Sequence, residues 1–259
     1  MKKTIINSVL FQILLIIILS SCKTMYRANR LNTPVFKKKK ELQTTLVTGA
    51  SGIELQGAYS INDNLAIMLN GVYDNSKVRV MDTIQGVKDG NSEYSNIYGE
   101  GAIGYYQSFG LDTSNMAAVF LGGGLGSTRG FSNHWGVDYL KYNSEYFRLF
   151  LQPTYGLILN RNVELAAAMR FSFMNYHSLN VIDTVTTFYS TNRMDVFVDP
   201  AVTLKVGFDQ FKFVAQAGSS LPLLKREYYT SAPLILSFGF HLNFTRFWEK
   251  PTEYYDQYE

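Results

Sequence analysis

The sequence predicts an all-β chain that folds as a transmembrane, antiparallel, up-and-down β-barrel of about ten strands, with eight strands as the alternative. Three observations predict this fold. Apolar and polar residues alternate over most of the 259-residue chain, as they do on the two faces of a strand. Only 17% of the residues are charged, against roughly 25% in soluble domains, and 15% are aromatic. Short turns alternate with long connections, which is the arrangement of barrels that cross a membrane.

Residues 1–21 have the three-part layout of a secretory signal peptide. Lys2 and Lys3 precede an apolar run from Val9 to Leu19, and small residues follow it. This run is shorter than the roughly 20 residues that a transmembrane helix needs, so we expect cleavage rather than a membrane span. The remaining chain has the length of one domain.

The end of the signal, Leu19-Ser20-Ser21-Cys22, resembles the lipobox of bacterial lipoproteins. The resemblance implies that the chain is cut before Cys22 and that this cysteine carries acyl chains. Each buried CH₂ contributes about 0.8 kcal/mol, so two or more acyl chains form a lasting membrane anchor. The alternative is an unmodified cysteine beside a signal-peptidase site. Because Cys22 is the only cysteine, a disulfide framework, a Cys-rich zinc module and an iron–sulfur centre are excluded.

Residues 22–40 are predicted to form a basic periplasmic tether. Residues 23–40 contain seven basic residues and no acidic residue, whereas residues 41–259 contain 15 Lys or Arg and 21 Asp or Glu. Pro34 and the absence of an apolar period argue against a helix. Two interpretations stay open. One is a linker held against anionic headgroups, with up to about 1 kcal/mol for each basic residue, and the other is a solvated spacer. Nucleic acid is not an expected partner of a secreted chain.

Residues 41–247 are predicted to form the barrel. In residues 52–60, for example, the apolar Ile53 and Leu55 alternate with the polar Glu54, and the same pattern recurs to the end of the domain. Several of these stretches match the 9–11 residues or more that cross a bilayer at a tilt. The ten predicted strands are 41–48, 52–60, 65–73, 93–107, 116–128, 143–159, 163–177, 193–206, 211–219 and 232–245.

The connections between the predicted strands alternate in length, except that the first, residues 49–51, is short where a long one would fall. The short ones are 61–64, 108–115, 160–162 and 207–210, and the long ones are 74–92, 129–142, 178–192 and 220–231. The alternation resembles that of bacterial outer-membrane barrels, in which the short turns face the periplasm. An even number of strands places both ends of the barrel domain on one side. We therefore expect the lipid anchor and the acidic tail, residues 248–259, to be periplasmic.

Alternation alone does not decide which face points outward, and a soluble barrel with an apolar interior is the alternative. The polar face consists mainly of Gly, Ala, Ser, Thr and Asn with few charges, which suits the interior of a narrow barrel better than a hydrated exterior. We therefore predict that Leu, Phe and Val point outward. An arginine at the outward Leu151 or Val202 should then cost more stability than a change at the inward Gln152 or Thr203.

Several charged residues fall on the inward face. Five acids and four bases nearly cancel, and in a ten-stranded barrel we expect them to pair across the lumen as a plug. The alternative is a lining that passes a small ion or solute. The nine residues are Glu54, Glu100, Arg148, Glu164, Arg170, Asp195, Asp199, Lys205 and Lys212, with His241 as a further inward candidate.

No catalytic, metal or cofactor site is expected. The glycines around Gly122–Gly126 lack the Lys-Ser/Thr and the helix of a phosphate-binding loop, and strand glycines usually mark curvature or the close approach of bulky neighbours. The stretch around His177 and Ser178 faintly resembles the His-x-Ser-Asn stretch of barrel lipases. Adjacent strand residues point to opposite faces, however, so His177 could not reach Ser178 as its base. The chain is therefore predicted not to be an enzyme.

Taken together, these features resemble the lipid-anchored outer-membrane barrels of the Bacteroidota type. The resemblance implies a structural or interaction role in an envelope complex, with outer-membrane lipid and an envelope protein as partners. A narrow channel for small solutes is the first alternative. A barrel enzyme that acts on outer-membrane lipid is the second.

Overall fold

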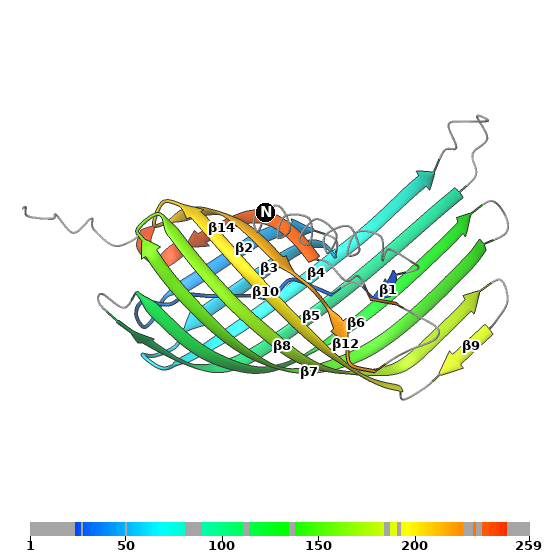
Figure 1. The fold of residues 1–259 in the computed structure, drawn as a ribbon, viewed down its shortest axis with the longest axis horizontal. Coiled ribbons are helices and arrows are strands. Elements are labelled where there is room, and N and C mark those ends of the chain that lie inside the picture. Colours follow the sequence, from blue (N-terminus) through cyan, green and yellow to red (C-terminus); the bar gives the residue numbers. More distant parts are fainter. Residues whose placement is uncertain are drawn as a thin grey trace, which may run out of the picture.

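The structure is a computed structural model, and it describes residues 24–26, 28–49, 51–80, 90–110, 114–134, 138–183, 187–190, 193–224, 230–231 and 235–247. Within these residues the chain forms a closed antiparallel barrel of ten strands, as predicted (Figure 1). The barrel strands are β2 (Leu42–Gly49), β3 (Gly52–Ser60), β4 (Leu65–Val80), β5 (Gly90–Phe109), β6 (Asn115–His134), β7 (Asp138–Asn160), β8 (Val163–Asp183), β10 (Arg193–Gly207), β11 (Phe211–Gly218) and β14 (Ile235–Asn243).

Two pairings close the ring. The last strand, β14, pairs antiparallel with the first, β2, and β8 pairs directly with β10. The short strands β9 (Thr187–Ser190) and β12 (Leu221–Pro222) pair with β8 and β10, and β1 (Thr24–Tyr26) pairs parallel with β13 (Thr230–Ser231). A 3₁₀ turn, η2 (Phe244–Phe247), follows β14.

Among the described residues, none of the helical segments has the length and hydrophobicity that a membrane-crossing helix requires.

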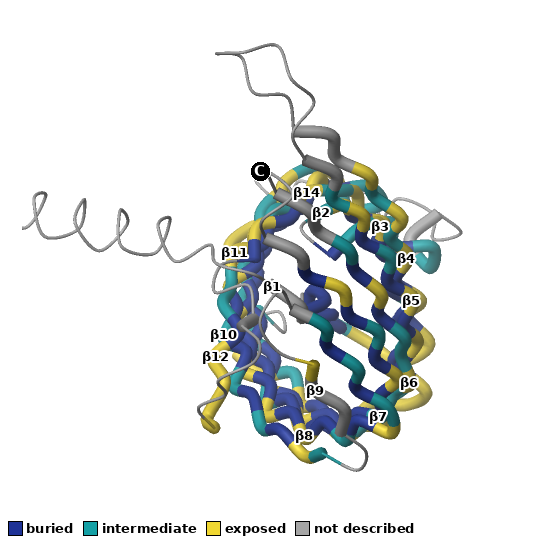
Figure 2. The backbone as a smooth tube through the Cα atoms, turned by 90° about the vertical axis from the view of Figure 1, so that its right-hand side faces the viewer, coloured by how far each residue is buried: buried dark blue, intermediate teal, exposed yellow. Residues whose placement is uncertain are grey.

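The predicted orientation of the two strand faces is confirmed. On β3 the polar Glu54 and Gln56 are buried, whereas Ile53 and Leu55 are 58% and 56% exposed. The same alternation of buried and exposed residues runs along neighbouring strands (Figure 2). Ten of the large apolar side chains on the exterior, each at least 43% exposed, are Leu46, Leu69, Ile97, Leu125, Leu149, Leu151, Val202, Phe213, Leu236 and Phe238. The lumen holds the polar face, so the soluble barrel with an apolar interior is wrong.

The apolar exterior leads to a prediction about Leu151, which lies near the middle of this band on β7 and is 43% exposed. If the band contacts lipid, Leu151→Arg should lower the free energy of unfolding by about 2–4 kcal/mol, because the guanidinium would enter hydrocarbon. Urea unfolding in lipid vesicles measures this loss. The matched control is Glu145→Arg, which changes an exposed residue on the same strand and should cost no more than about 0.5 kcal/mol. If both substitutions lowered the free energy of unfolding by the same small amount, Leu151 and Glu145 would both be in contact with water, and the apolar band would not contact lipid.

The strands β4 to β8 are longer than predicted. Continuations of these strands occupy residues 74–80 and 90–92, 129–134 and 138–142, and 178–183 of the predicted loops 74–92, 129–142 and 178–192. β7 therefore has 23 residues, whereas β2 and β11 have 8 each. The five long strands project beyond the other five at one end, which we call the extended end (Figure 1, right). The opposite end carries the short turns, and we call it the turn end. Outward residues near the extended end, such as Lys141 and Glu145, are polar. The alternation of outward apolar and inward polar residues, which marks the parts of the strands nearer the turn end, is therefore lost there.

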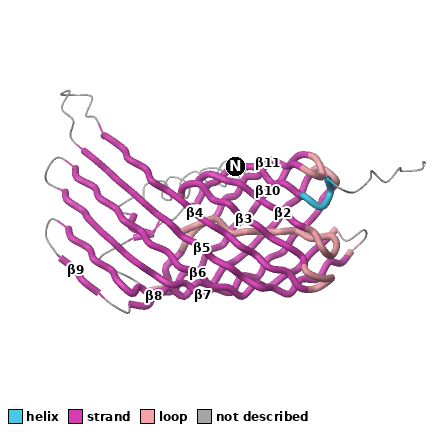
Figure 3. The backbone as a smooth tube through the Cα atoms, turned by 180° about the vertical axis from the view of Figure 1, so that it is seen from behind, coloured by secondary structure: helices cyan, strands magenta, loops and turns pink. Residues whose placement is uncertain are grey.

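The structure contradicts the predicted tether, residues 22–40, more clearly than any other expectation. Every residue from Ala28 to Phe36 is buried, and we call residues 28–36 the lumen segment. This segment runs as an extended loop through the barrel from the extended end to the turn end (Figures 2 and 3). A spacer outside the barrel, whether solvated or held on headgroups, is therefore wrong for these residues. The physical reason is that the lumen supplies hydrogen-bond partners for an extended backbone.

The expectation that the lipid anchor and the acidic tail are periplasmic concerns Cys22 and residues 248–259, which the structure does not describe, so it stays a prediction. At the turn end, the backbone N–H of Leu42 donates to Thr245 Oγ1 at 2.8 Å, which joins the start of β2 to the 3₁₀ turn that follows β14. Thr24–Tyr26, however, lies toward the extended end beside Thr230–Ser231 (Figure 1). An even strand number fixes where the strands begin and end, but the chain before residue 41 turns back through the lumen. Cys22, residues 1–21 and the tail 248–259 lie outside the described residues.

Candidate functional site

The structure places all nine predicted inward charges inside the lumen. Each exposes 7% or less of its surface, and the set is Glu54, Glu100, Arg148, Glu164, Arg170, Asp195, Asp199, Lys205 and Lys212. His241, the further candidate, is 4% exposed, and its Nδ1 shares a 2.9 Å hydrogen bond with Thr45 Oγ1. The lumen therefore gathers nine charged side chains and one histidine in a buried interior.

Arg170 on β8 and Glu100 on β5 form a bidentate ion pair across the barrel. The Nη2–Oε1 and Nη1–Oε2 distances are 2.9 and 3.1 Å, and neither side chain is exposed to solvent. Arg170 Nε also donates to Gln152 Oε1 at 3.0 Å, and its guanidinium lies 4.2 Å from the centroid of the Phe150 ring. Tyr98 Oη donates to Glu100 Oε2 at 2.6 Å. Such charge-assisted bonds fix the two charges at the centre of the lumen.

Glu164 on β8 lies between two lysines. Lys212 Nζ on β11 donates to Glu164 Oε1 at 2.6 Å, and Lys205 Nζ on β10 lies 3.9 Å from Oε2. Lys205 and Glu164 are direct cross-strand partners in the β8–β10 register. Lys205 Nζ also donates to the carbonyl oxygen of Thr33 at 3.1 Å. This cluster therefore couples the barrel wall to the lumen segment.

Asp199, another of the predicted charges, is held by hydroxyl groups. Asp199 accepts hydrogen bonds from Ser220 Oγ at 2.6 Å and Ser172 Oγ at 3.2 Å. Asp195 is buried on the same strand, β10. The expected plug of charges is thus built partly from carboxylate–base pairs and partly from hydroxyl donors.

Four of the predicted charges bind the lumen segment directly: Lys205 through Thr33, Glu100 through Asn29 Nδ2 at 3.4 Å, and also Glu54 and Arg148. Glu54 accepts the backbone N–H of Arg30 at 2.9 and 3.1 Å and also bonds Ser51 Oγ. Arg148 Nη1 donates to Asn29 Oδ1 at 2.5 Å, and its guanidinium lies 4.8 Å from the centroid of the Tyr98 ring. The charges therefore recognise a segment of the chain that the sequence interpretation had placed outside the barrel.

Glutamine side chains satisfy the backbone of the lumen segment. Gln216 donates to the carbonyl of Leu31 at 2.9 Å and accepts the N–H of Leu31 at 3.1 Å. Gln43 makes the same two bonds to Val35, at 2.8 and 3.4 Å. A glutamine amide has one donor end and one acceptor end, so it can bind both backbone groups of a residue as a neighbouring strand would.

Two further glutamines extend this pattern. Gln56 donates to the carbonyl of Arg30 at 3.2 Å, and Gln152 donates to the carbonyl of Asn32 at 2.7 Å. The four glutamines lie on β3, β2, β7 and β11, and each exposes 3% or less of its surface. The sequence analysis did not single out these glutamines. Four inward glutamines among small residues nevertheless indicate that the lumen binds a polar group, such as a peptide backbone.

Side chains of the lumen segment also fit the wall. Thr33 Oγ1 donates to Thr203 Oγ1 at 3.0 Å, and Asn32 Nδ2 donates to Asn70 Oδ1 at 2.8 Å. Phe36 packs on Tyr106 with a ring-centroid distance of 5.2 Å. Gln152 and Thr203 are fully buried among these contacts, so we now expect changes there to be costly as well.

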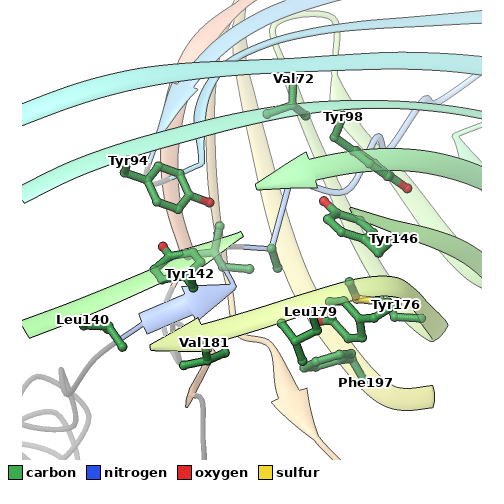
Figure 4. Close-up of a cluster of buried hydrophobic side chains, with 13 residues drawn as sticks. Val72, Tyr94, Tyr98, Leu140, Tyr142, Tyr146, Tyr176, Leu179, Val181 and Phe197 are labelled. Carbon is green, nitrogen blue, oxygen red and sulfur yellow. The ribbon is translucent and has the colours of Figure 1, made fainter. Parts of the chain in front are cut away.

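The glycines of β6 serve packing. On the inward face of this strand, a Cβ at Gly122, Gly126 or Gly130 would lie 2.1–2.5 Å from ring atoms of Phe150, Tyr146 or Tyr142 on β7. The aromatic rings therefore lie directly against the glycine backbone. Tyr142 and Tyr146 belong to the buried cluster at the extended end that Figure 4 shows, together with Tyr94, Tyr98 and Tyr176. This is the close approach of bulky neighbours that the sequence favoured over a phosphate site.

His177 lies at an irregularity in the β7–β8 ladder. Glu145 pairs with Ser178 and Tyr146 pairs with Tyr176, so His177 is an extra residue on β8 and its side chain is exposed. Such bulges bend a strand and redirect a side chain. Among the residues that the structure describes, no group of three or more His, Cys, Asp or Glu side chains is arranged to hold a metal ion.

No protein-family model matches the sequence, and no curated protein matches it significantly. Solved barrel structures do match. The translocator domain of the autotransporter NalP from Neisseria meningitidis is 10% identical over 79% of this chain and 86% of that chain, with a TM-score of 0.45. CarO of Acinetobacter baumannii is 9% identical over 79% and 97%, with a TM-score of 0.33. OmpT, an outer membrane protein of Vibrio cholerae, is 8% identical over 78% and 95%, with a TM-score of 0.27.

Proposed function

We propose that the protein is a non-conducting outer-membrane β-barrel that is anchored by lipid at Cys22 and has a structural or interaction role in an envelope complex. One observation carries this proposal: the chain's own lumen segment fills the barrel from the extended end to the turn end. A ten-stranded barrel has little space beyond what side chains fill, so an extended peptide and nine charged groups leave no continuous path for solutes.

The exterior of the barrel supports a membrane location. A soluble protein rarely exposes a continuous apolar surface of this extent, whereas a bilayer requires one. Near the turn end, exposed aromatic side chains stand at the border of this band, as in the aromatic girdles of membrane barrels. They are Tyr105, Phe109, Tyr155 and Phe208, which are 44–71% exposed. A secretory signal together with a closed antiparallel barrel favours the bacterial outer membrane.

The proposed partners follow from the same features. Outer-membrane lipid would contact the apolar exterior and hold the acyl chains of Cys22. An envelope protein is the proposed macromolecular partner, and co-purification in mild detergent is the way to find it. Nucleic acid is not proposed as a partner.

Conductance of the purified protein tests the proposal. Wild-type protein in a planar lipid bilayer should show no steady current at moderate voltage, because the lumen segment and the pair Arg170–Glu100 block the lumen. Insertion is verified in the same samples by protease protection of the barrel. A steady, ion-selective wild-type conductance would replace the proposal with the narrow channel.

The lipid anchor has a separate test. If Cys22 is acylated, Cys22→Ser should abolish incorporation of labelled palmitate and leave the precursor uncut, because the thiol is the acceptor. The matched control is Ser21→Ala, which keeps the thiol and should still be labelled. Equal labelling of Cys22→Ser and the wild type would contradict the anchor. Localisation is a poor readout here, since the apolar exterior of the barrel can hold the variant in the membrane by itself.

A further inference from the structure

We infer that this barrel carries its own N-terminal segment across the membrane and presents Thr24–Tyr26 at the extended end, opposite the turns and the C-terminal side of β14. The barrel would thus act as a conduit that is permanently occupied by its own peptide. The membrane location rests on the proposed function, but the threading itself does not.

The position of the segment at the turn end is fixed by several hydrogen bonds. The N–H of Lys40 donates to the carbonyl of Ser60 at 2.8 Å, and the N–H of Ser60 donates to the carbonyl of Glu41 at 3.0 Å. Ser108 Oγ donates to the carbonyl of Phe36 at 2.8 Å. Ser60 ends β3 and Ser108 lies near the end of β5, so Phe36 stands at the turn-end mouth.

Contacts farther back along the segment follow in order toward the extended end. Val35 bonds Gln43 near the start of β2, Leu31 bonds Gln216 near the end of β11, and Asn29 bonds Arg148 in the middle of the long strand β7. Since β2 and β11 both pair antiparallel with β14, both run from the turn end toward the extended end, so Gln43 near the start of one strand and Gln216 near the end of the other mark successive heights in the barrel. Thr24–Tyr26 then pairs with Thr230–Ser231, in the connection that joins β12 to β14 at the extended end.

The length of the lumen segment matches the thickness of a membrane. Nine residues from Ala28 to Phe36 in extended form span about 30 Å. The apolar band of a membrane barrel is about 25 Å tall. The segment is therefore long enough to place Tyr26 on one side of the hydrocarbon and Lys37 on the other.

Charge keeps the segment from sliding. Four consecutive lysines, Lys37–Lys40, stand at the turn-end mouth, where Lys39 pairs with Asp63 at 3.6 Å. Drawing these lysines into the lumen would remove four charged groups from water, which is costly. In the other direction, withdrawal of the segment would leave the backbone-binding glutamines without their partners. Both movements are opposed, so the threaded state is stable.

The threading changes which face of the membrane receives the anchor. Cys22 is two residues before Thr24, a separation that a fully extended chain covers with about 7 Å. Acyl chains on Cys22 would therefore enter the leaflet at the extended end. In an outer membrane with periplasmic turns, this is the outer leaflet at the cell surface.

Labelling of introduced cysteines tests the threading. The three variants are Met25→Cys in β1, Lys77→Cys on the exposed projection of β4 and Asp63→Cys in the turn between β3 and β4. A membrane-impermeant maleimide is applied to intact cells and to permeabilised cells, and labelling of the unmodified protein is subtracted. We expect Met25→Cys to be labelled on intact cells like Lys77→Cys, at least fivefold more than Asp63→Cys.

The outcome separates the threading from the proposed location. If Met25→Cys is labelled together with Asp63→Cys instead, the threading is wrong, whatever the orientation of the barrel. If Met25→Cys and Lys77→Cys are labelled together but only after permeabilisation, the threading stands and the proposed orientation fails.

A cross-link inside the lumen provides the second readout. Thr33 Oγ1 and Thr203 Oγ1 are 3.0 Å apart, so Thr33→Cys combined with Thr203→Cys should form a disulfide upon mild oxidation. The bond closes a covalent loop and shifts the mobility of the denatured protein on a gel. Each single variant is the control. Absence of the shift in folded, oxidised double variant would overturn the threading.

Discussion

Arg170→Ala is expected to lower the free energy of unfolding by about 3–5 kcal/mol, which is a large fraction of the stability of a barrel of this size. Arg170 is fully buried and forms a bidentate pair with Glu100, whose side chain is not exposed either. Removal of the guanidinium leaves the carboxylate of Glu100 without its cation in a site that excludes water. It also removes the bond to Gln152 and the contact with the Phe150 ring.

A matched surface pair provides the control for this prediction. Arg161 pairs with Asp209 in the turn region, and the side chain of Arg161 is 74% exposed. Exposed pairs contribute about 0–1 kcal/mol, so Arg161→Ala should have little effect. The double variant Arg170→Met with Glu100→Gln should regain most of the lost stability, since no unpaired charge remains. Urea unfolding in detergent micelles measures all four proteins. Similar losses for Arg170→Ala and Arg161→Ala would show that water reaches the central pair.

Deletion of residues 27–36 is expected to turn the silent barrel into one that conducts ions. The deletion removes the extended peptide along the lumen and exposes the glutamines and charged groups that bind it, which then take up water. Acidic and basic residues remain on the wall, so the current should be modest and sensitive to salt. Planar bilayer recordings of the deletion variant beside the silent wild type measure the change.

A deletion of equal length elsewhere is the control. Removal of residues 250–259 leaves the lumen segment in place and should leave the barrel silent. A synthetic peptide of residues 27–37, added to the deletion variant, should restore the block. If the deletion variant does not assemble, Gln43→Ala with Gln216→Ala weakens the hold on Val35 and Leu31 and should give intermittent current. A deletion variant that assembles and stays silent would show that side chains of the wall alone close the lumen.

The sequence could predict which charged residues line the lumen, but not which of them pair with one another. The inward residues follow from the period of two, because each strand residue alternates between lumen and exterior whatever the partner strand. Arg170 and Glu100 lie on β8 and β5, which are not neighbours in the sheet. Their contact depends on strand tilt and on closure of the ring, which local patterns do not encode. Lys205 and Glu164 lie on neighbouring strands, but only the register between β8 and β10 places them opposite each other.

The sequence by itself determined the ten strands, their two faces and the turn end, since alternation and turn residues are local properties of the chain. Two features were decided only by the tertiary structure. The continuation of β4 to β8 depends on cross-strand hydrogen bonds. In that region the outward face is mainly polar and the buried inward face is aromatic or aliphatic, as at Tyr142 and Leu179, so the pattern of an apolar exterior gives no signal there. The lumen segment shows no alternation of apolar and polar residues. Its backbone forms hydrogen bonds to side chains of the barrel wall and not to a neighbouring strand, so it has no two faces to distinguish. The position of the lumen segment is set by side chains on several strands, which only the closed barrel brings around one axis. In the sequence it is recognisable only as part of a basic stretch before the first strand.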